Sequence, residues 1–272
     1  MPIKDVSDRS LAELSRLDGR VAVVTGAALG IGRAISRRLV ESGATVVAAD
    51  INEGALAETV AAIAKETGGT IEGAFVDVRD SPTIDALVDG AVSRHGKIDI
   101  MVCNAGIYPN QTIDAIDDEA WGRVFEINVR GASVGARAAA RHMIARGAGG
   151  VIVTLGSVNG YRAFGPGLTH YTASKHAIHG LTKALAVELG PHDIRVVSVA
   201  PTMVETEGVA VLRDVMGESE FGPAMQAMAE KHPAGRVAAP DDIARVAVWL
   251  TTDAAVMVNG TAVDVDGGYL SA

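Results

Sequence analysis

The sequence predicts an α/β fold in which seven parallel strands form one doubly wound sheet, with helices on both faces and a single domain. Three observations lead to this prediction. Short β-branched segments recur along the 272 residues, and most are apolar nearly throughout, as expected of parallel strands covered on both faces. Amphipathic segments rich in Ala, Leu, Arg and Glu separate them. A glycine-rich turn follows the first strand, at the edge where such sheets bind ligands.

The expected elements alternate from about residue 20 to the C-terminus. The expected strands are 21–25, 45–49, 71–76, 98–103, 151–155, 195–199 and 262–265. The expected helices are 32–41, 53–66, 84–94, 120–146, 173–188 and 241–250. No Pro- or Ser-rich linker divides residues 19–272, so we expect one domain there. Residues 1–18 form an N-terminal extension, in which Leu11, Leu14 and Leu17 have the spacing of a short docked helix.

The segment 201–233 interrupts this alternation. It follows the C-terminal end of an expected strand and holds several Met, Val and Leu side chains among acidic residues. A long insertion at this edge of the sheet predicts a substrate loop or lid.

Composition narrows the class of protein. The net charge of −9 disfavours nucleic acid and anionic membranes as partners. The single cysteine, Cys103, fits a reducing compartment, and the N-terminus has no signal-peptide pattern, so a cytoplasmic protein is expected. The mean hydropathy of +0.24 suggests that some apolar surface is buried between subunits.

Gly26, Gly30 and Gly32 lie where a strand turns into a helix. A tight turn and close backbone approach to a pyrophosphate both need residues without Cβ, and the helix N-terminus offers free N–H groups to phosphates. The next expected strand leads to Asp50, 18 residues after Gly32, whose carboxylate can accept hydrogen bonds from ribose hydroxyls and would repel a 2′-phosphate. No basic residue lies between Gly26 and Gly32 or at Ile51, so NAD is expected rather than NADP.

A second set of residues predicts acid–base chemistry. Tyr171 and Lys175 are four residues apart and would share one helix face. A nearby ammonium and a positive nicotinamide ring favour the phenolate, which lets a tyrosine exchange a proton with an alcohol or ketone. Ser157 follows a strand at the same edge of the sheet and can hold the substrate oxygen.

Together these residues resemble the short-chain dehydrogenase/reductase family, a Rossmann-fold family of alcohol dehydrogenases and ketoreductases. The resemblance spans about residues 17–270. Its carriers are Thr25-Gly-x-x-x-Gly-Ile-Gly32, Asp50, Asp77-Val78, Asn104-Ala-Gly106, Asn128, Ser157, Tyr171-x-x-x-Lys175 and Val265-Asp-Gly-Gly268.

The resemblance implies roles for these residues. Tyr171 would be the acid/base and Ser157 would orient the substrate, while Lys175 would lower the pKa of Tyr171 and hold the nicotinamide ribose. Asn128 would anchor a water that links Lys175 to solvent. The implied cofactor-binding residues are Gly26, Leu29, Gly30, Ile31, Gly32, Asp50, Ile51, Asp77, Val78, Asn104, Ala105, Gly106, Tyr171, Lys175, Pro201, Val204 and Thr206.

Two positions depart from the family pattern. Cys103 stands where an Asn is frequent, and its place at the end of a buried strand predicts a small apolar filler. Thr202 stands where a Gly often follows Pro201, and its Cβ restricts the backbone beside the nicotinamide site.

The residues expected around the substrate are mostly apolar. They suit a neutral secondary alcohol or ketone. The expected pocket residues are Ser157, Asn159, Tyr161, Phe164, Leu168, Met203, Val209 and Leu212. His170, His176 and His179 have no carboxylate or Cys partner at ligand spacing, so no metal site is expected.

Two alternatives remain open at this stage. One is a 3-oxoacyl-thioester reductase of the same family, which usually uses NADPH and a basic surface for a carrier protein. The other is a catalytically silent dinucleotide-binding sensor. The resemblance also implies a homotetramer, and the small residues of 131–140 would suit a close helix interface or packing against the sheet of the same subunit.

Overall fold

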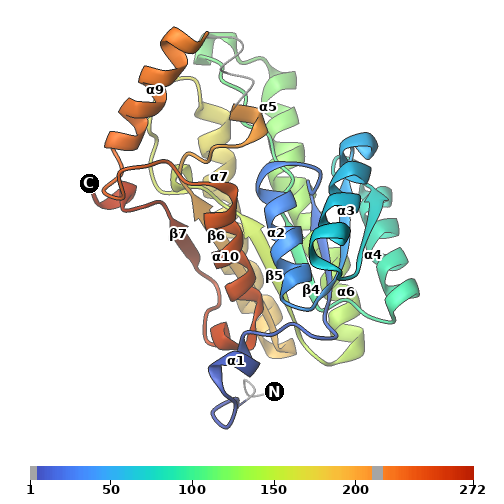
Figure 1. The fold of residues 1–272 in the computed structure, drawn as a ribbon. Helices are drawn as coiled ribbons and strands as arrows, with labels where there is room; N and C mark the ends of the chain where they lie inside the picture. The colour runs from blue at the N-terminus through green and yellow to red at the C-terminus, as the bar shows by residue number, and fades with distance from the viewer. Residues whose placement is uncertain (1–4, 210–216) are drawn as a thin grey trace.

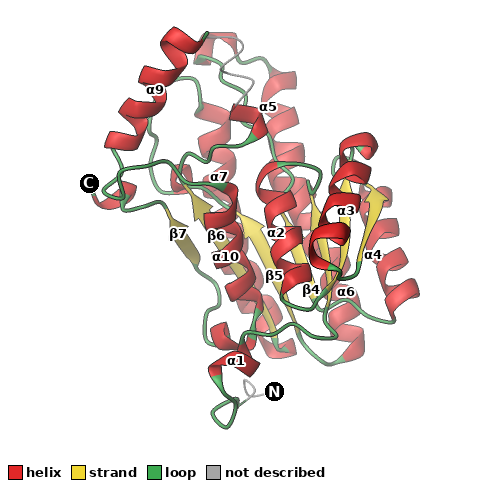
Figure 2. Cartoon of the chain, in the orientation of Figure 1, coloured by secondary structure: helices red, strands yellow, loops and turns green. Residues whose placement is uncertain are grey.

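A computed structural model describes residues 5–209 and 217–272, and it contains one parallel sheet of seven strands in the order β3-β2-β1-β4-β5-β6-β7 (Figures 1 and 2). This confirms the predicted fold class. The strands are β1 (Val21–Thr25), β2 (Thr45–Asp50), β3 (Ile71–Phe75), β4 (Ile100–Cys103), β5 (Gly150–Leu155), β6 (Ile194–Pro201) and β7 (Ala262–Val265).

Helices cover both faces of the sheet, with α2, α3 and α10 toward the viewer in Figure 1. The principal helices are α2 (Gly30–Glu41), α3 (Glu53–Thr67), α4 (Ser81–His95), α5 (Asp118–Phe125), α6 (Ala132–Arg146), α7 (Thr169–Leu189), α9 (Glu218–Glu230) and α10 (Pro240–Thr251). Successive strand residues face opposite sides, so Ala22 and Val24 belong to one apolar cluster and Val23 to the other.

The strand order determines where along its edge the sheet would bind a ligand. β1 pairs with β2 on one side and with β4 on the other, so the connections leaving β1 and β4 run in opposite directions along the sheet. The crevice at the carboxyl ends of such a pair is where doubly wound sheets bind ligands. The glycine-rich turn after β1 and the Asn104 segment after β4 both lie at this point.

The helix expected over 120–146 is interrupted. It consists of α5, a π-helical segment η2 (Glu126–Gly131) and α6. The small residues of 131–140 pack inside the subunit, because a Cβ on Gly135 would lie 2.9 Å from Met101 Cε and 3.1 Å from Cys103 Sγ. This contact supports the second reading of the stretch, in which its small side chains let α6 approach β4 of the same chain.

The N-terminal helix is shorter than the leucine spacing suggested. α1 spans Leu11–Leu14, begins with a capping box between Ser10 and Glu13, and leaves Leu11 exposed. Leu17 lies beyond the helix but is buried in the core, so the extension is docked as expected. No helix within the described residues is long and apolar enough to cross a membrane.

Candidate active site

The glycine-rich turn is built by steric necessity. Gly26 and Gly30 adopt positive φ angles of 65° and 55°, which side-chain-bearing residues rarely adopt. A Cβ on Gly32 would lie 2.0 Å from the Gly26 carbonyl oxygen, and one on Gly26 would lie 2.8 Å from Ala105 Cα. The three glycines therefore allow the turn, the start of α2 and the loop after β4 to approach one another closely.

Asn104 joins the two loops of this crevice. Its Nδ2 donates to the carbonyl oxygens of Thr25 and Gly26, both at 2.9 Å. The Thr25 hydroxyl in turn accepts hydrogen bonds from the backbone N–H groups of Asn104 and Ala105 at 3.2 and 3.3 Å. Because these side chains hold the backbone on both sides, the cradle is preorganised.

The residues present fit a dinucleotide. α2 has no side-chain cap of its own, and the Gly30 N–H donates to the carboxylate of Glu207 at 2.9 Å, so this helix N-terminus already holds an anionic group. Asp50 accepts hydrogen bonds from the N–H groups of Ala28 and Asn52 at 3.0 and 2.9 Å, which fixes its carboxylate beside the turn.

Other cofactor candidates line the same edge. Leu29 and Ile51 expose apolar side chains on either side of Asp50 in the sequence. Asp77 follows β3, where its carboxylate pairs with Arg79, which holds the pKa of Asp77 below its usual value. Val78 packs against the position of Gly131, where an added Cβ would be 3.0 Å from Val78 Cβ.

Tyr171 and Lys175 lie one turn apart near the start of α7. Lys175 Nζ donates to the carbonyl oxygen of Leu155 at 2.6 Å and lies 5.5 Å from the centroid of the Tyr171 ring. Burial lowers the pKa of Lys175 to about 8, since desolvation disfavours the ammonium.

The protein's own groups leave Tyr171 as a neutral phenol. Burial raises the pKa of Tyr171, an interaction with the Ser157 side chain lowers it, and Tyr108 raises it further. Burial of the phenol is the largest of these causes, and the Lys175 ammonium is directed at Leu155 O. Ser157 is itself buried, and its hydroxyl accepts a hydrogen bond from the Asn159 N–H at 3.1 Å.

Asn128 lies in the π-helical segment η2, a deformation often found at functional sites. Its Oδ1 accepts from the Ile107 N–H at 2.8 Å, while Nδ2 donates to Ile107 O at 2.9 Å and to Ser174 Oγ at 3.1 Å. Both amide hydrogens are engaged, so a water on Asn128 would have to be held by an oxygen, either Oδ1 or the main-chain carbonyl.

The loop 201–206 closes this edge. Val204 is buried and forms a β-bridge with Ala238, in which Ala238 N–H donates to Met203 O at 3.1 Å and Glu205 N–H donates to Ala238 O at 2.9 Å. Thr206 lies against the glycine-rich turn, since a Cβ on Gly30 would be 3.2 Å from Thr206 Cγ2. Pro201 ends β6, so the loop starts at the carboxyl edge of the sheet.

The expected substrate residues make contacts on several different elements. Asn159 contacts both Ser157 and, through its Oδ1, the Thr172 hydroxyl at 3.2 Å. The Tyr161 ring packs at a tilt against His179, two turns along α7 from Tyr171, and its hydroxyl donates to Ala262 O on β7 at 3.1 Å. These contacts direct the Tyr161 side chain toward His179 and β7.

The remaining pocket candidates lie on three segments. Phe164 contacts Tyr269, with ring centroids 4.8 Å apart. Leu168 precedes α7, and Val209 is buried in the first turn after Thr206. Leu212 lies outside the described residues.

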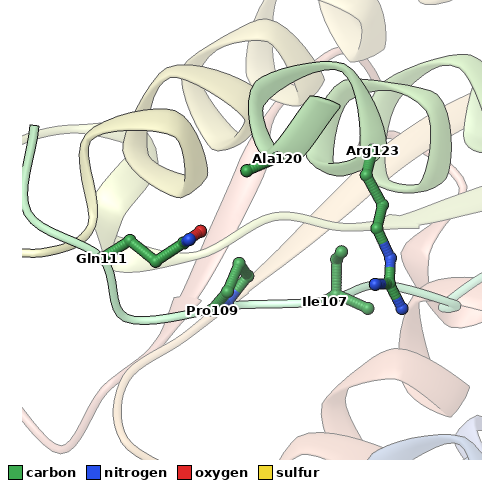
Figure 3. A pocket seen from close by; sticks show the side chains of 5 residues that line it. All are labelled: Ile107, Pro109, Gln111, Ala120 and Arg123. Carbon is green, nitrogen blue, oxygen red and sulfur yellow. The ribbon is translucent and has the colours of Figure 1, made fainter. Parts of the chain in front are cut away.

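A pocket of about 430 Å³ lies beside the catalytic cluster and is lined by none of these candidates. Figure 3 shows its lining residues on the loop after β4 and on α5: Ile107, Pro109, Gln111, Ala120 and Arg123. Gln111 connects it to the start of α7, because its Oε1 lies 3.3 Å from His170 Nε2.

Two site residues were missed by sequence reasoning. Tyr108 meets Tyr171 edge to face, with centroids 6.3 Å apart, and a Cβ on Gly208 would lie 2.4 Å from its hydroxyl. Glu207 reaches Gly30 from the segment that follows β6. The signal for both was position: Tyr108 follows the Asn104-Ala-Gly106 motif and Glu207 follows Thr206. Within the described residues, no cluster of three or more His, Cys, Asp or Glu could hold a metal ion.

Comparison with known proteins assigns the class. Residues 26–270 match a family model described as enoyl-(acyl carrier protein) reductase, a branch of the short-chain dehydrogenase/reductases. The chain belongs to the short-chain dehydrogenase/reductase family, and it is an oxidoreductase of the kind that acts on alcohols and ketones.

Two characterised relatives illustrate the range of substrates. The chain is 38% identical to 3beta-hydroxysteroid dehydrogenase 2 of Eggerthella lenta, over 93% of this chain and 95% of that protein. It is 40% identical to cis-4-hydroxycyclohexanecarboxylate dehydrogenase of Sinomonas cyclohexanicum, over 92% and 96%.

Two solved structures are similar throughout and differ in coenzyme. Carveol dehydrogenase from Mycobacterium avium, in complex with NAD, superimposes with a TM-score of 0.85 at 35% identity, over 94% of this chain and 99% of that one. Gluconate 5-dehydrogenase from Burkholderia cenocepacia, in complex with NADP and tartrate, gives 0.87 at 34% identity, over 97% and 100%. Relatives of this chain therefore bind either dinucleotide.

Proposed function

We propose that the protein is an NAD-dependent alcohol dehydrogenase or carbonyl reductase that uses Ser157, Tyr171 and Lys175 on a neutral, apolar secondary alcohol or ketone. The observation that carries this proposal is the arrangement at one edge of the sheet. The Tyr171 hydroxyl interacts with Ser157, and Lys175 lies one turn away, next to a crevice whose glycine-rich turn fits a dinucleotide.

In the proposed reaction each of these side chains has a separate role. When bound, the nicotinamide supplies the hydride acceptor or donor, and its oxidised form carries a positive charge that favours the phenolate of Tyr171. Tyr171 Oη then takes the proton from the substrate hydroxyl during oxidation, or returns it to the carbonyl oxygen during reduction. Ser157 Oγ holds the same oxygen. Lys175 donates one N–H to Leu155 O, and its two other N–H groups can donate to ribose hydroxyls.

The preference for NAD rests on charge. Asp50 ends β2 with a carboxylate fixed by two backbone N–H groups; the residue that follows it, Ile51, is apolar, and so is Leu29 in the glycine-rich turn. A 2′-phosphate placed there would meet a negative charge without a cation between them. Arg33 is exposed within α2 and lies 4.0 Å from Glu207, so it faces the lid.

The substrate proposal rests on the apolar character of Phe164, Leu168, Met203 and Val209. The names of two relatives describe a hydroxyl on a ring system, which favours a cyclic secondary alcohol. A third relative is named D-threitol dehydrogenase, so linear polyols belong among the tested compounds.

The direct test is NADH formation by the purified protein with cyclic, steroidal, aromatic and linear secondary alcohols, each offered with NAD+ and with NADP+. Turnover of neutral cyclic alcohols with NAD+ supports the proposal. Turnover with NADP+ alone would overturn the coenzyme assignment. Reduction of 3-oxoacyl or enoyl thioesters with no alcohol turnover would favour the thioester reductase. The description of the matching family model names such a reaction.

A silent dinucleotide sensor predicts a different result. It would bind NADH tightly and turn over none of these compounds, and Asp50→Arg would abolish that binding. Against it stands the complete set of Ser157, Tyr171 and Lys175, which a sensor has no need to keep.

We also propose a homotetramer. Apolar side chains remain exposed on helices behind the sheet, among them Trp121 and Ile144, and Val187 near the end of α7 is 81% exposed. Light scattering that gives the mass of one chain, 28.0 kDa, would contradict this assembly.

A further inference from the structure

Thr202 makes a contact that a glycine could not make. Its hydroxyl oxygen lies 2.8 Å from Nε2 of His232, a residue thirty positions further along the chain, just after α9. The Cβ of Thr202 causes no backbone strain, because Asp193 is the one non-glycine residue with positive φ in the described ranges 5–209 and 217–272. The departure from the family pattern is therefore compatible with the loop and adds a hydrogen bond to it.

The direction of this hydrogen bond follows from the other ring nitrogen of His232. Nδ1 lies 2.8 Å from the Met228 carbonyl oxygen, which can only accept. Nδ1 therefore carries the proton, and in the neutral ring Nε2 is an acceptor. The Thr202 hydroxyl donates to it. His232 is 2% exposed, so removal of either partner would leave a buried polar atom unsatisfied.

His232 also connects the lid to the substrate side of the site. Its ring stacks on Tyr269, with centroids 4.7 Å apart at an angle of 21°, and Tyr269 packs against Phe164 at 4.8 Å. The Arg162 guanidinium lies 4.7 Å above the Phe164 ring. One continuous column therefore runs from the loop before α7, through the C-terminal turn, to Thr202.

The hydrogen bonds described for loop 201–206 are mostly made by its backbone. Backbone bonds hold it to Ala238 on one side, and Thr202 N–H makes a long contact of 3.5 Å with Val265 O. The Thr202–His232 hydrogen bond lies between these two attachments. It is the described side-chain contact through which the end of α9 fixes the start of the loop.

We propose that His232 is a positioning residue: through Thr202 it holds loop 201–206 in the conformation that binds the nicotinamide end of the coenzyme, and it couples that loop to Phe164 through Tyr269. This inference rests on the proposed function, which places the nicotinamide at this loop. It predicts that the pair acts on the nicotinamide half of the coenzyme more than on the adenosine half, because Thr202 lies at the β6 end of the loop, whereas the contacts with Gly30 come from Thr206 and Glu207 at its other end.

ADP-ribose separates a positioning role from a general structural one, since it contains the adenosine and pyrophosphate but no nicotinamide. The variants are Thr202→Val, which removes the hydroxyl at nearly constant volume, Thr202→Ser, which keeps it, and His232→Leu. Thr252→Val is the matched control, because it removes another buried hydroxyl, one bonded to Trp249 O at the end of α10. Dissociation constants for NADH and for ADP-ribose are measured by fluorescence and calorimetry, and thermal stability is followed in parallel.

We expect Thr202→Val to weaken NADH binding about tenfold, as loss of a buried hydrogen bond would, and to leave ADP-ribose binding unchanged. Thr202→Ser should restore NADH binding, and the double variant with His232→Leu should bind no worse than His232→Leu alone. Thr252→Val should lower stability without changing either constant. Unchanged NADH binding in Thr202→Val, or equal weakening of NADH and ADP-ribose, would overturn the inference alone. Failure of the parent protein to bind NADH would overturn the proposed function and this inference with it.

Discussion

The carboxylate of Glu207 accepts a hydrogen bond from the backbone N–H of Gly30 at 2.9 Å, which places a side chain from the segment after β6 at the N-terminus of α2. In the proposed function this N-terminus binds the coenzyme pyrophosphate. The carboxylate of Glu207 therefore lies where the pyrophosphate, a second anion, would bind. A Cβ on Gly208 beside it would lie 2.4 Å from the hydroxyl of Tyr108, whose ring packs against Tyr171, so the same short segment also lies near Tyr171.

Glu207→Gln is expected to strengthen NADH binding about two- to fivefold, the scale of a single charge at a helix terminus. The amide can still accept the Gly30 N–H bond but no longer repels the pyrophosphate. Binding is measured by NADH fluorescence at low and high salt, and the gain should shrink as salt screens the charge.

Glu205→Gln is the matched control for this prediction. Glu205 is two residues away and exposed, and its backbone N–H donates to Ala238 O. The Glu205→Gln substitution therefore removes the same charge without affecting the contact with Gly30. An equal gain in both variants would show that net charge, and not the Gly30 contact, sets coenzyme affinity.

Asp50→Ala is expected to raise KM for NAD+ by about ten- to a hundredfold, as loss of hydrogen bonds to a charged acceptor would, and to improve NADP+ relative to NAD+. The measurement is kcat/KM with each coenzyme at a fixed alcohol concentration. Asp50→Asn keeps one acceptor oxygen for the Ala28 N–H and should fall between parent and Asp50→Ala. An unchanged ratio of the two coenzymes would mean that Asp50 does not contact the ribose.

The buried His179 is expected to make the free energy of unfolding decrease at acidic pH. Burial first, then the charges of His176, Lys175 and Lys183, lower the pKa of His179 to about 4 from 6.5, and its Nε2 has no hydrogen-bond partner among the described residues. In the unfolded chain His179 protonates near pH 6.5, whereas in the folded protein it stays neutral until about pH 4. Stability is therefore full above pH 6.5 and falls as the pH drops toward 4, by on the order of 3 kcal/mol.

Urea unfolding of the parent and of His179→Gln between pH 7 and pH 4 measures this contribution. Other titrating groups are common to both proteins, so the variant should gain stability relative to the parent as the pH falls through this window. A constant difference between the two across the window would show that His179 titrates normally in the folded protein.

The fold was predictable because its signals are local. Apolar runs such as 21–25 and the glycine spacing at Gly26 and Gly32 are read directly from the sequence, and the parallel sheet follows from the alternation of strands and helices. The break of the helix over 120–146 was not visible, since the residues of η2 keep helical spacing and the contact of Asn128 with Ile107 joins residues far apart in the sequence.

The predicted site was incomplete for a related reason. Ser157, Tyr171 and Lys175 have fixed spacing, but their pKa values depend on burial, which the sequence does not reveal: the ammonium of Lys175 is directed at Leu155 O and the phenol is buried. Contacts between distant segments, such as Thr202 with His232, carry no sequence signal at all. Tyr161 was assigned to the pocket by position, while the fold turns it toward His179.

The most direct measurement compares the parent with Tyr171→Phe, using initial rates of NADH formation from a cyclic secondary alcohol together with the NADH dissociation constant of each protein. Removal of the hydroxyl alone should lower kcat by about 10²- to 10⁴-fold, the usual contribution of a proton-transfer group, and should leave NADH binding nearly unchanged. Near-parental turnover in Tyr171→Phe would contradict the assignment of Tyr171 as the acid/base.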